Sequence, residues 1–332
     1  MRVLLTGATG FVGSQVLDQL LDRGDEVRVL VLPGTLESLC HRNRVEIVEG
    51  SISDSAVLAE ASRGAEVVYH LAAIHLSALR AVADPKDLRI VNVEGTDRLL
   101  RACATSAVRR IVFTSTVAVY NAAPWPFMWP IHETHPLRIS GEDNLRSYAL
   151  SKIEAENLIR RAHQEYGIEA IVLRATAVYG PGAPWVERLL RALAANPWST
   201  LTRAGRFACN QWIHRHDLAR AVVMGGTTMG LRHEICNVAG PELFSAWDLL
   251  IAMSRALQQG PWQHLAAPEP ARTARYCYRY DLTRALMRLT IAPQIKLETG
   301  LPGVLKLMTP APEIASIWQD RHGSPLAELE LF

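Results

Sequence analysis

A tyrosine and a lysine four positions apart, Tyr148 and Lys152, are the residues whose types and spacing point most directly to proton chemistry. They begin a strongly helical stretch, and residues at i and i+4 share one helix face, so the ammonium is expected beside the phenol. A free phenol has a pKa near ~10 and is a poor proton carrier at neutral pH. A nearby ammonium favours the phenolate, so we expect Lys152 to lower the pKa of Tyr148 and make it a general acid and base. An ordinary pair on a helix surface has the same spacing and is the alternative.

Hydroxyl side chains end a second stretch that bears on the same chemistry. Residues 111–113 have the composition of a buried strand, and Thr114, Ser115 and Thr116 follow them. The carboxyl ends of parallel strands form the edge at which such sheets bind ligands. A hydroxyl there can donate to a substrate carbonyl and stabilise developing negative charge, so we predict that Thr116 orients the substrate oxygen. Capping of the strand end by hydroxyls is the alternative.

Three glycines near the beginning of the chain, Gly7, Gly10 and Gly13, indicate where an anionic group would bind. An apolar run over 3–5 precedes them and a helical pattern over 14–23 follows. In this context Gly7 permits the tight turn, Gly10 lets the backbone approach a pyrophosphate, and Gly13 lets the helix pack on the sheet. The sequence therefore predicts a dinucleotide site at the helix N-terminus. A plain surface turn is the alternative.

The end of the second predicted strand bears on which dinucleotide would bind. In such sites an acid at this position binds the ribose hydroxyls, whereas an arginine accepts a 2′-phosphate. This chain has Leu32 there, followed by Pro33 and Gly34, and so carries neither charge. The sequence leaves NAD and NADP open as cofactors.

Strand-like and helical stretches alternate through the first half of the chain, with strands predicted over 3–5, 26–32, 45–48, 67–71, 111–113 and 171–179 and helices over 14–23, 91–103 and 148–166. This alternation predicts an α/β fold of the Rossmann type, a doubly wound parallel sheet covered on both faces. After residue 182 prolines break the chain into shorter elements, which indicates a smaller C-terminal substrate-capping domain. We expect a dinucleotide-binding domain over 1–180, with returning segments at about 211–240 and 275–290, and a capping domain from 181–210, 241–274 and 291–332.

Composition narrows the class of protein. Hydrophobic residues make up 49% of the 332 residues and the formal net charge is +2, so the sequence gives no electrostatic case for nucleic acid or a membrane surface. The five cysteines are odd in number and scattered, which fits a reducing compartment, and with no leader pattern visible we expect a cytoplasmic protein. Two histidine clusters, at 132–135 and 214–217, lack the helical spacing or the context of a metal site, so no metal is expected.

Taken together, the motifs resemble the extended short-chain dehydrogenase/reductase family, which includes the NAD-dependent epimerase/dehydratase group. The matching segments follow the family's order: TGATGFVG, VVYHLAA, NVEGT, FTSTVAVY, YALSK and LRATAVYGPG. Later family blocks have counterparts in WIHRHDLARA, NVAGPELFSAWDLL and YDLTRALMRLTIAPQIKLETGL, so the resemblance covers nearly the whole chain. It implies an NAD(P)-dependent enzyme with a small-molecule substrate and a homodimer formed through the helices predicted over 91–103 and 148–166.

The resemblance also implies roles for individual residues. The catalytic residues are Thr116, Tyr148, Lys152 and Asn92, the last of which steadies the helix and the proton relay. The cofactor-binding residues are Gly7, Thr9, Gly10, Phe11, Val12, Gly13, Leu32, Ser51, Ile52, Leu71, Ala72, Ala73, Thr114, Tyr148, Lys152 and Tyr179. The substrate-binding residues are His75, Thr116, Val117, Tyr148, Ala177 and Trp185.

Three departures from the family pattern bear on cofactor and reaction. Ser51 stands where the family usually has an acid that holds the adenine amine, so that contact is expected from Ser51 or the Ile52 backbone. Val117 and Ala118 replace the Asp-Glu pair of sugar dehydratases, which disfavours elimination of water. Asn210 stands in the slot of the arginine with which nucleotide-sugar epimerases grip a diphosphate.

We therefore expect an oxidoreductase that moves hydride reversibly between NAD or NADP and a secondary alcohol or ketone of a small or apolar substrate, nearer the reductase and steroid-dehydrogenase-like branch. A nucleotide-sugar epimerase with tightly bound NAD and a catalytically inert dinucleotide-sensing protein stay open as alternatives. Trp185 would suit an apolar pocket, but it would equally suit the core of the capping domain.

Overall fold

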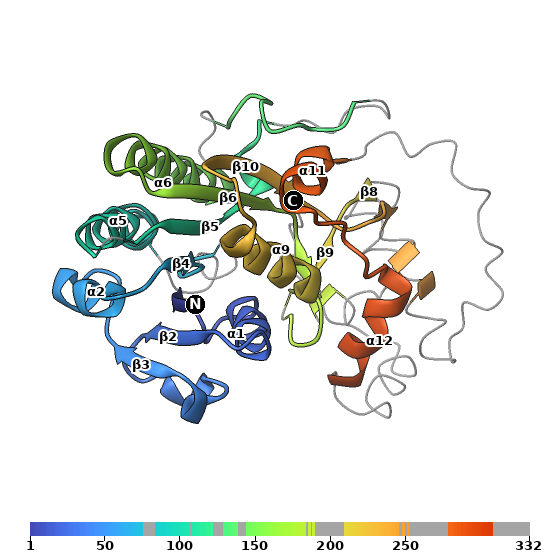
Figure 1. Cartoon of the computed structure of the whole chain (residues 1–332). Helices are drawn as coiled ribbons and strands as arrows, with labels where there is room; N and C mark the ends of the chain where they lie inside the picture. The colour runs from blue at the N-terminus through green and yellow to red at the C-terminus, as the bar shows by residue number, and fades with distance from the viewer. Residues whose placement is uncertain are drawn as a thin grey trace.

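A seven-stranded parallel sheet forms the centre of the molecule (Figure 1). The computed structural model describes residues 1–75, 84–106, 108–121, 129–138, 144–183, 185–186, 188–189, 209–245, 248–249, 251–252 and 278–307. The strand order is β10-β6-β5-β4-β1-β2-β3. The strands are β1 (Arg2–Thr6), β2 (Glu26–Val31), β3 (Glu46–Glu49), β4 (Val67–His70), β5 (Arg110–Thr116), β6 (Glu169–Ala175) and β10 (His233–Val238). The predicted Rossmann-type sheet is confirmed.

Helices cover both faces of this sheet. One face packs against α1 (Gly13–Asp22) and α9 (Arg215–Thr227), and the other packs against α2 (Ser55–Ser62), α5 (Gly95–Thr105) and α6 (Asn144–Tyr166) (Figure 1). The described residues also form the α-helices α4 (Pro85–Leu88), α11 (Thr283–Leu289) and α12 (Leu297–Leu307). Because α6 lies beside β5 and β6, the Tyr148–Lys152 pair comes to the sheet edge where β5 ends.

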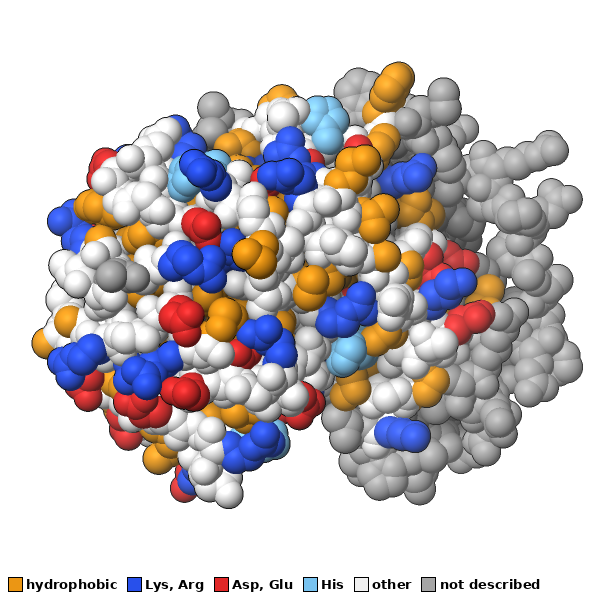
Figure 2. Space-filling view, viewed as in Figure 1, with side chains coloured by type: hydrophobic (Ala, Val, Ile, Leu, Met, Phe, Trp, Pro, Cys, Tyr) orange, Lys and Arg blue, Asp and Glu red, His pale blue; other side chains and the backbone are white. Residues whose placement is uncertain are grey.

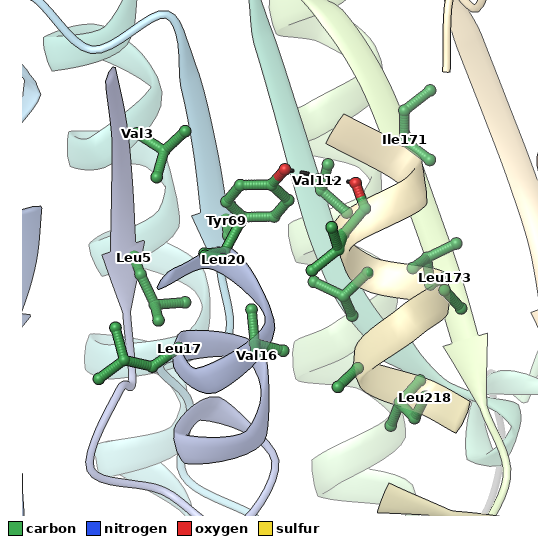
Figure 3. Close-up of a cluster of buried hydrophobic side chains, with 14 of the residues drawn as sticks. Val3, Leu5, Val16, Leu17, Leu20, Tyr69, Val112, Ile171, Leu173 and Leu218 are labelled. Atoms are coloured by element: carbon green, nitrogen blue, oxygen red, sulfur yellow. Dashed lines mark hydrogen bonds between the residues drawn. The ribbon is translucent and has the colours of Figure 1, made fainter. Parts of the chain in front are cut away.

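Residues alternate between the two faces along each strand, as the pleat requires. Val3 and Leu5 of β1 join the core with α1 and α9, whereas Leu4 between them joins the core with α2, α5 and α6. Figure 3 shows the first of these cores, in which Tyr69 of β4 extends its ring between α1 and α9 and donates to the Val223 carbonyl at 3.3 Å. Most positions of the inner strands β1, β4, β5 and β6 are therefore buried, which explains their nearly continuous apolar runs in the sequence.

The strand order reverses between β1 and β4, and this reversal sets the place of the candidate site. The chain passes outward from β1 to β2 and β3 and then returns to β4 on the other side of β1. In sheets of this kind, ligands bind outside the carboxyl ends of the strands at such a switch point. The loop over 7–12 follows β1 there, and residues 71–75 follow β4.

Three local differences from the sequence expectations have simple causes. The strand expected over 171–179 is two strands, because β6 ends at Ala175 and β7 (Val178–Tyr179) pairs with β9 (Ile213–His214) instead of the central sheet. The helix expected over 91–103 begins with a π-helical turn, Arg89–Glu94, before α5. Helix α2 was not expected, since its small side chains give little apolar periodicity.

Segments beyond residue 180 contribute to the sheet and to a separate apolar cluster. Both α9 and β10 return to the sheet, while β8 (Cys209–Asn210) pairs with β11 (Phe244–Ser245) outside it. Cluster members from β7, β11 and α12 include Tyr179, Phe244 and Leu301. Much of the predicted capping domain lies outside the described residues, so the division into two domains stays a prediction.

The described surface carries charges of both signs. On the face in Figure 2, Lys and Arg side chains are interspersed with Asp and Glu rather than gathered in one patch. Among the helices of the described segments, none combines the length and the apolar character that crossing a bilayer requires.

Candidate active site

The loop between β1 and α1 has the shape of a dinucleotide cradle. Gly7 has φ +79°, and a Cβ on it would lie 2.8 Å from the Ala72 backbone nitrogen. A Cβ on Gly13 would lie 1.9 Å from the Gly7 carbonyl oxygen, so α1 can begin this close to the turn only with glycine there. The Gly10 amide donates to the same carbonyl at 3.0 Å and closes the turn.

This cradle leaves room and donors for an anion. No side chain caps α1, whose N-cap residue is Val12. The Ser14 amide donates to the Gly10 carbonyl at 2.9 Å, and the N-terminus of an uncapped helix favours an anionic group. Thr9 and Phe11 lie on the same loop, and the Arg215 guanidinium carbon lies 5.3 Å from the centre of the Phe11 ring. The residues present therefore fit the pyrophosphate of a dinucleotide.

Tyr148 and Thr116 meet at the carboxyl end of β5. The Tyr148 side chain is buried, and its hydroxyl is hydrogen-bonded to the Thr116 hydroxyl. The Thr116 oxygen also accepts from the Ala118 amide at 3.1 Å, so its own proton is available for Tyr148. The exposed ring of His75 lies edge-on to Tyr148, with 5.4 Å between ring centres. The structure thus brings together three residues that the sequence analysis named separately.

Lys152 lies one helical turn from Tyr148 and is also buried. Its ammonium nitrogen is 4.2 Å from the centre of the Phe113 ring, a cation–π contact with β5. Burial lowers the pKa of Lys152 to about 7, and the carboxylate of Glu156 opposes this fall. Lys152 therefore titrates near neutral pH in the ligand-free protein.

The electrostatics of Tyr148 differ from the sequence expectation. Burial raises the pKa of the Tyr148 phenol, and the hydrogen bond with Thr116 offsets only part of that rise. The expected lowering of the Tyr148 pKa by Lys152 is therefore not found. The reason is physical: a buried site disfavours the charged form of both groups, which the spacing of two residues on a helix does not reveal.

Asn92 connects the end of β4 with α6. Its Oδ1 accepts from the Ile74 amide at 2.8 Å, and its Nδ2 donates to the Ile74 carbonyl at 3.0 Å and to Ser151 Oγ at 3.1 Å. Ser151 Oγ in turn donates to the Tyr148 carbonyl at 2.7 Å. Asn92 sits in the π-helical turn, a feature often found at functional sites, and it fixes the backbone that carries Tyr148.

A buried histidine, which the sequence analysis did not select, links the glycine loop to Asn92. Thr6 Oγ1 lies 2.8 Å from His70 Nδ1, and His70 Nε2 lies 3.0 Å from Thr96 Oγ1, which donates to the Asn92 carbonyl at 2.7 Å. Because Thr96 gives its proton to Asn92, His70 Nε2 must be the donor to Thr96 and Nδ1 the acceptor from Thr6. Burial, with a smaller contribution from Lys152, lowers the pKa of His70 to about 3, so this chain is built on the neutral ring.

A second buried polar group was also missed. Glu156 accepts from Ser115 Oγ at 2.5 Å and from Arg174 Nε and Nη2 at 3.1 and 2.6 Å. Arg174 also donates to the Tyr120 hydroxyl at 3.1 Å, and the Tyr120 hydroxyl donates to Asn237 at 2.5 Å. The available signal was polar residues ending apolar strand runs, together with an acid one turn beyond Lys152.

The other residues expected around the cofactor lie near the carboxyl ends of the strands. Leu32 directly follows β2 with 55% of its surface exposed, and Ser51 follows β3. Ile52 is buried against Gly95 of α5. The segment over 71–73 follows β4. Thr114 Oγ1 is buried and has no hydrogen-bond partner among the residues that the structure describes.

The residues expected around the substrate separate into two groups. His75, Thr116 and Tyr148 lie together, and Val117 follows Thr116 in the short turn Val117–Val119. The Ala177 carbonyl accepts from Ile213.

Tyr179 belongs to the apolar cluster with Phe244 and Leu301, and Trp185 packs against that cluster. The Tyr179 hydroxyl donates to the Ile295 carbonyl at 3.4 Å. The half-buried Trp185 ring packs edge-on against Trp212 and donates to the Val178 carbonyl at 2.9 Å.

The two histidine clusters considered for metal are engaged within the protein. His132 Nδ1 lies 2.7 Å from Thr134 Oγ1, and Glu133 accepts from the Asn237 amide. His214 caps α9, and Asp217 accepts from two backbone amides over 294–295. Across the described ranges, no three His, Cys, Asp or Glu side chains gather as metal ligands would.

Comparison with known proteins supports a single family. Residues 3–239 match the model of the NAD dependent epimerase/dehydratase family. The chain is 34% identical over 190 residues to a UDP-glucose 4-epimerase of Mycolicibacterium smegmatis, covering 54% of this chain and 57% of that one. It is 28% identical over 255 residues to 3 beta-hydroxysteroid dehydrogenase type 7 of Mus musculus, covering 67% and 66%. The chain thus spans between about half and two thirds of the length of these relatives.

A solved structure extends the likeness to the whole fold. The UDP-glucose 4-epimerase of Thermus thermophilus in complex with NAD superimposes with a TM-score of 0.70 at 25% identity, covering 94% of this chain and all of that one. The family match covers well over half of the chain and includes the glycine loop, β5 and the Tyr148–Lys152 turn. The chain belongs to the NAD-dependent epimerase/dehydratase family of the extended short-chain dehydrogenases/reductases.

Proposed function

We propose that this protein is an oxidoreductase that transfers hydride reversibly between NAD or NADP and a secondary alcohol or ketone of a small or apolar substrate. The observation that supports this most is the hydrogen bond between the Tyr148 and Thr116 hydroxyls, with Lys152 one turn away, at the carboxyl edge of the sheet. Two neighbouring hydroxyls can both contact one substrate oxygen. A proton can then pass between the Tyr148 hydroxyl and that oxygen.

The cofactor would lie across the switch point between β1 and β4. The loop over 7–13 and the uncapped α1 would hold its pyrophosphate, and the unpartnered Thr114 hydroxyl lies at the carboxyl end of β5. When bound, the nicotinamide supplies the hydride acceptor or donor. Leu32 offers neither an acid to the ribose nor a cation to a 2′-phosphate, so the proposal covers both dinucleotides.

The protein's own residues would handle the proton. Thr116 would orient the substrate oxygen. During reduction the Tyr148 phenol would give its proton to the substrate oxygen and become a phenolate, and during oxidation the phenolate would take the proton of the substrate hydroxyl. The Lys152 ammonium would stabilise the Tyr148 phenolate, because an opposite charge at close range favours the ionised phenol. Asn92 would keep the α6 backbone in register through Ser151.

A nucleotide-sugar epimerase is the second candidate, favoured by the 34% identity to a UDP-glucose 4-epimerase. Two observations weigh against it. Asn210 of β8 offers an amide where a diphosphate grip would use arginine. Its neighbour Gln211 is buried, and both ends of its amide are engaged by the Gly240 carbonyl and the Tyr280 amide. The proposal therefore puts the oxidoreductase first.

One set of assays separates the candidates. Purified protein is titrated with NAD and with NADP by calorimetry and then given secondary alcohols, ketones and UDP-sugars, while reduced nicotinamide is followed by its absorbance. The proposal predicts net formation or consumption of reduced cofactor with at least one alcohol or ketone. Conversion of a UDP-sugar to its epimer without net change in the cofactor would support the epimerase, and cofactor binding with no conversion in any assay would support a dinucleotide sensor.

Assembly and location complete the proposal. A homodimer would form through α5 and α6, which flank a groove lined by both arginines and acids, among them Arg89 and Glu154. Light scattering of the eluted protein gives its mass directly, and a mass of one chain would contradict this part. The four cysteines within the described segments are all free thiols, which fits the cytoplasmic placement that we propose.

A further inference from the structure

We infer that Glu156 is a positioning residue that keeps Lys152 in its ammonium form, and that Ser115 and Arg174 hold the Glu156 carboxylate in place for this task. Tyr148, Lys152 and Glu156 are spaced by four along α6, so they lie on one helix face. The catalytic consequence rests on the proposed function, whereas the effect on the charge of Lys152 does not.

The position of the Glu156 carboxylate is fixed from three directions. Ser115 Oγ donates at 2.5 Å, and Arg174 binds both carboxylate oxygens, at 3.1 and 2.6 Å. The residues are nearly inaccessible, at 7% exposed for Glu156, 3% for Arg174 and 4% for Ser115. Hydrogen bonds of this kind favour the ionised carboxylate, so the negative member of the Glu156–Arg174 pair is carried by α6 itself, one turn from Lys152.

The surroundings of the ammonium give Glu156 its importance. Lys152 is 3% exposed, and its ammonium lies over the ring face of Phe113 of β5. The titratable groups that act on it from the neighbouring elements are His70 of β4, His75 beyond β4 and Glu156 of its own helix. The two histidines can add only positive charge. Glu156 is the anionic group among them, and it opposes the fall in the Lys152 pKa that burial causes.

This arrangement gives a reason for a buried ion pair beneath an active site. A buried pair seldom adds much stability, because the cost of removing both charges from water offsets their attraction. A charge held beside a lysine whose pKa is about 7 has a different effect. It increases the fraction of Lys152 that is protonated at neutral pH, and only that form can stabilise a Tyr148 phenolate.

The direct test measures the charge of Lys152 without any substrate. The sequence contains four lysines, Lys86, Lys152, Lys296 and Lys306, so carbon-13 labelling of lysine gives four resonances whose titration is followed by NMR. Glu156→Gln is expected to lower the pKa of Lys152 by at least about half a unit, because the nearby charge is lost. Glu156→Asp keeps the charge and is expected to restore most of the wild-type value.

A matched control lies on the same helix. Glu154→Gln makes the identical chemical change at an exposed residue paired with Arg89, and it is expected to leave the Lys152 titration where it is. An equal Lys152 pKa in wild type and Glu156→Gln would overturn the inference. So would an equal shift in Glu154→Gln, because the effect would then be one of overall charge.

Two further measurements keep the test decisive. If Glu156→Gln does not fold, the double variant Glu156→Gln/Arg174→Met removes the pair together and leaves no uncompensated buried charge. A fall in the Lys152 pKa is again expected, smaller than in Glu156→Gln because the positive charge of Arg174 is removed as well, and an unchanged value contradicts the inference. In the enzyme assay, the alkaline limb of the kcat/KM profile should move to lower pH in Glu156→Gln. Loss of activity with an unmoved limb would indicate a merely structural role. A shifted NMR titration in a protein without oxidoreductase activity would leave this inference standing and remove the proposed function.

Discussion

The two faces of the central sheet bury different kinds of side chain at their carboxyl ends. On the face covered by α1 and α9, most inward positions are apolar, as the Val3, Leu5 and Leu173 cluster in Figure 3 shows, although Arg110 of β5 donates to a carbonyl of α9 there. On the face covered by α5 and α6, the last inward residues of four neighbouring strands are polar: Thr6, His70, Ser115 and Arg174. The apolar face holds the sheet together, whereas the polar face connects the glycine loop to the helix that carries Tyr148 and Lys152.

This difference costs stability on the polar face. Each buried polar group there must find a partner, because an unpaired one loses its hydration without compensation. The hydrogen bonds that satisfy these groups also fix the directions of the side chains. Apolar contacts fix them less strictly. The polar face should therefore respond to substitution through charge and direction, and the apolar face through volume.

The largest effect is expected at the glycine loop between β1 and α1, where an added Cβ would meet the backbone. Gly13→Ala places a Cβ 1.9 Å from the Gly7 carbonyl oxygen, so it should lower the free energy of unfolding by at least about 3 kcal/mol and abolish dinucleotide binding. Gly34→Ala is the control, since its φ is +78° and its surroundings are open; it should cost only about 1–2 kcal/mol. Denaturant unfolding and calorimetry measure both, and equal costs would contradict the account.

On the polar face, breaking the buried ion pair should be nearly as damaging. Arg174→Met leaves Glu156 charged and buried without its partner, and the expected loss in denaturant unfolding is about 3–5 kcal/mol. The surface pair of Arg89 and Glu154, with 64% and 45% of the two side chains exposed, supplies the control. Arg89→Met should cost less than about 1 kcal/mol. A loss below about 1 kcal/mol for both variants would mean that the buried Glu156 carboxylate does not depend on Arg174.

The pH dependence of stability should separate the faces further. Between pH 6.5 and about 3 the unfolded chain binds a proton at His70 that the folded protein excludes, so stability falls as pH falls through this window. His70→Asn removes that proton and should reduce the slope by about 1.4 kcal/mol per pH unit. Thr96→Val removes the hydrogen-bond partner but keeps the ring, and its slope should stay like that of wild type. Equal slopes for His70→Asn and wild type would refute the neutral, buried His70.

The smallest effect is expected from the Tyr69 hydroxyl, a polar group on the face covered by α1 and α9. Tyr69→Phe removes a hydroxyl that donates to the Val223 carbonyl at 3.3 Å and lies against Gly226. The expected loss in thermal or denaturant unfolding is about 0.5–1.5 kcal/mol, the usual net worth of one hydrogen bond. If Tyr69→Phe lowered the free energy of unfolding as much as Arg174→Met, the two faces would not differ in the way described.

The features that the sequence predicts are those whose residues lie close together along the chain. The glycine cradle lies within seven residues, and the spacing of Tyr148 and Lys152 is set by one helical turn, so both are visible in the chain. The partners of Glu156 and His70 are not, because Ser115 is 41 positions from Glu156 and Thr6 is 64 from His70. The direction of the Tyr148 pKa could not be foreseen either, since it depends on burial by residues from other elements.

The central claim is that Tyr148 carries the proton beside a dinucleotide seated on the glycine loop. Replacing Tyr148 with Phe and measuring turnover and cofactor affinity on the same preparation tests it most directly. Tyr166→Phe, at the exposed end of the same helix, serves as the matched control. The account predicts a fall in turnover of at least about a hundredfold for Tyr148→Phe, with cofactor affinity close to wild type and no change in the control. Undiminished turnover in Tyr148→Phe would contradict it.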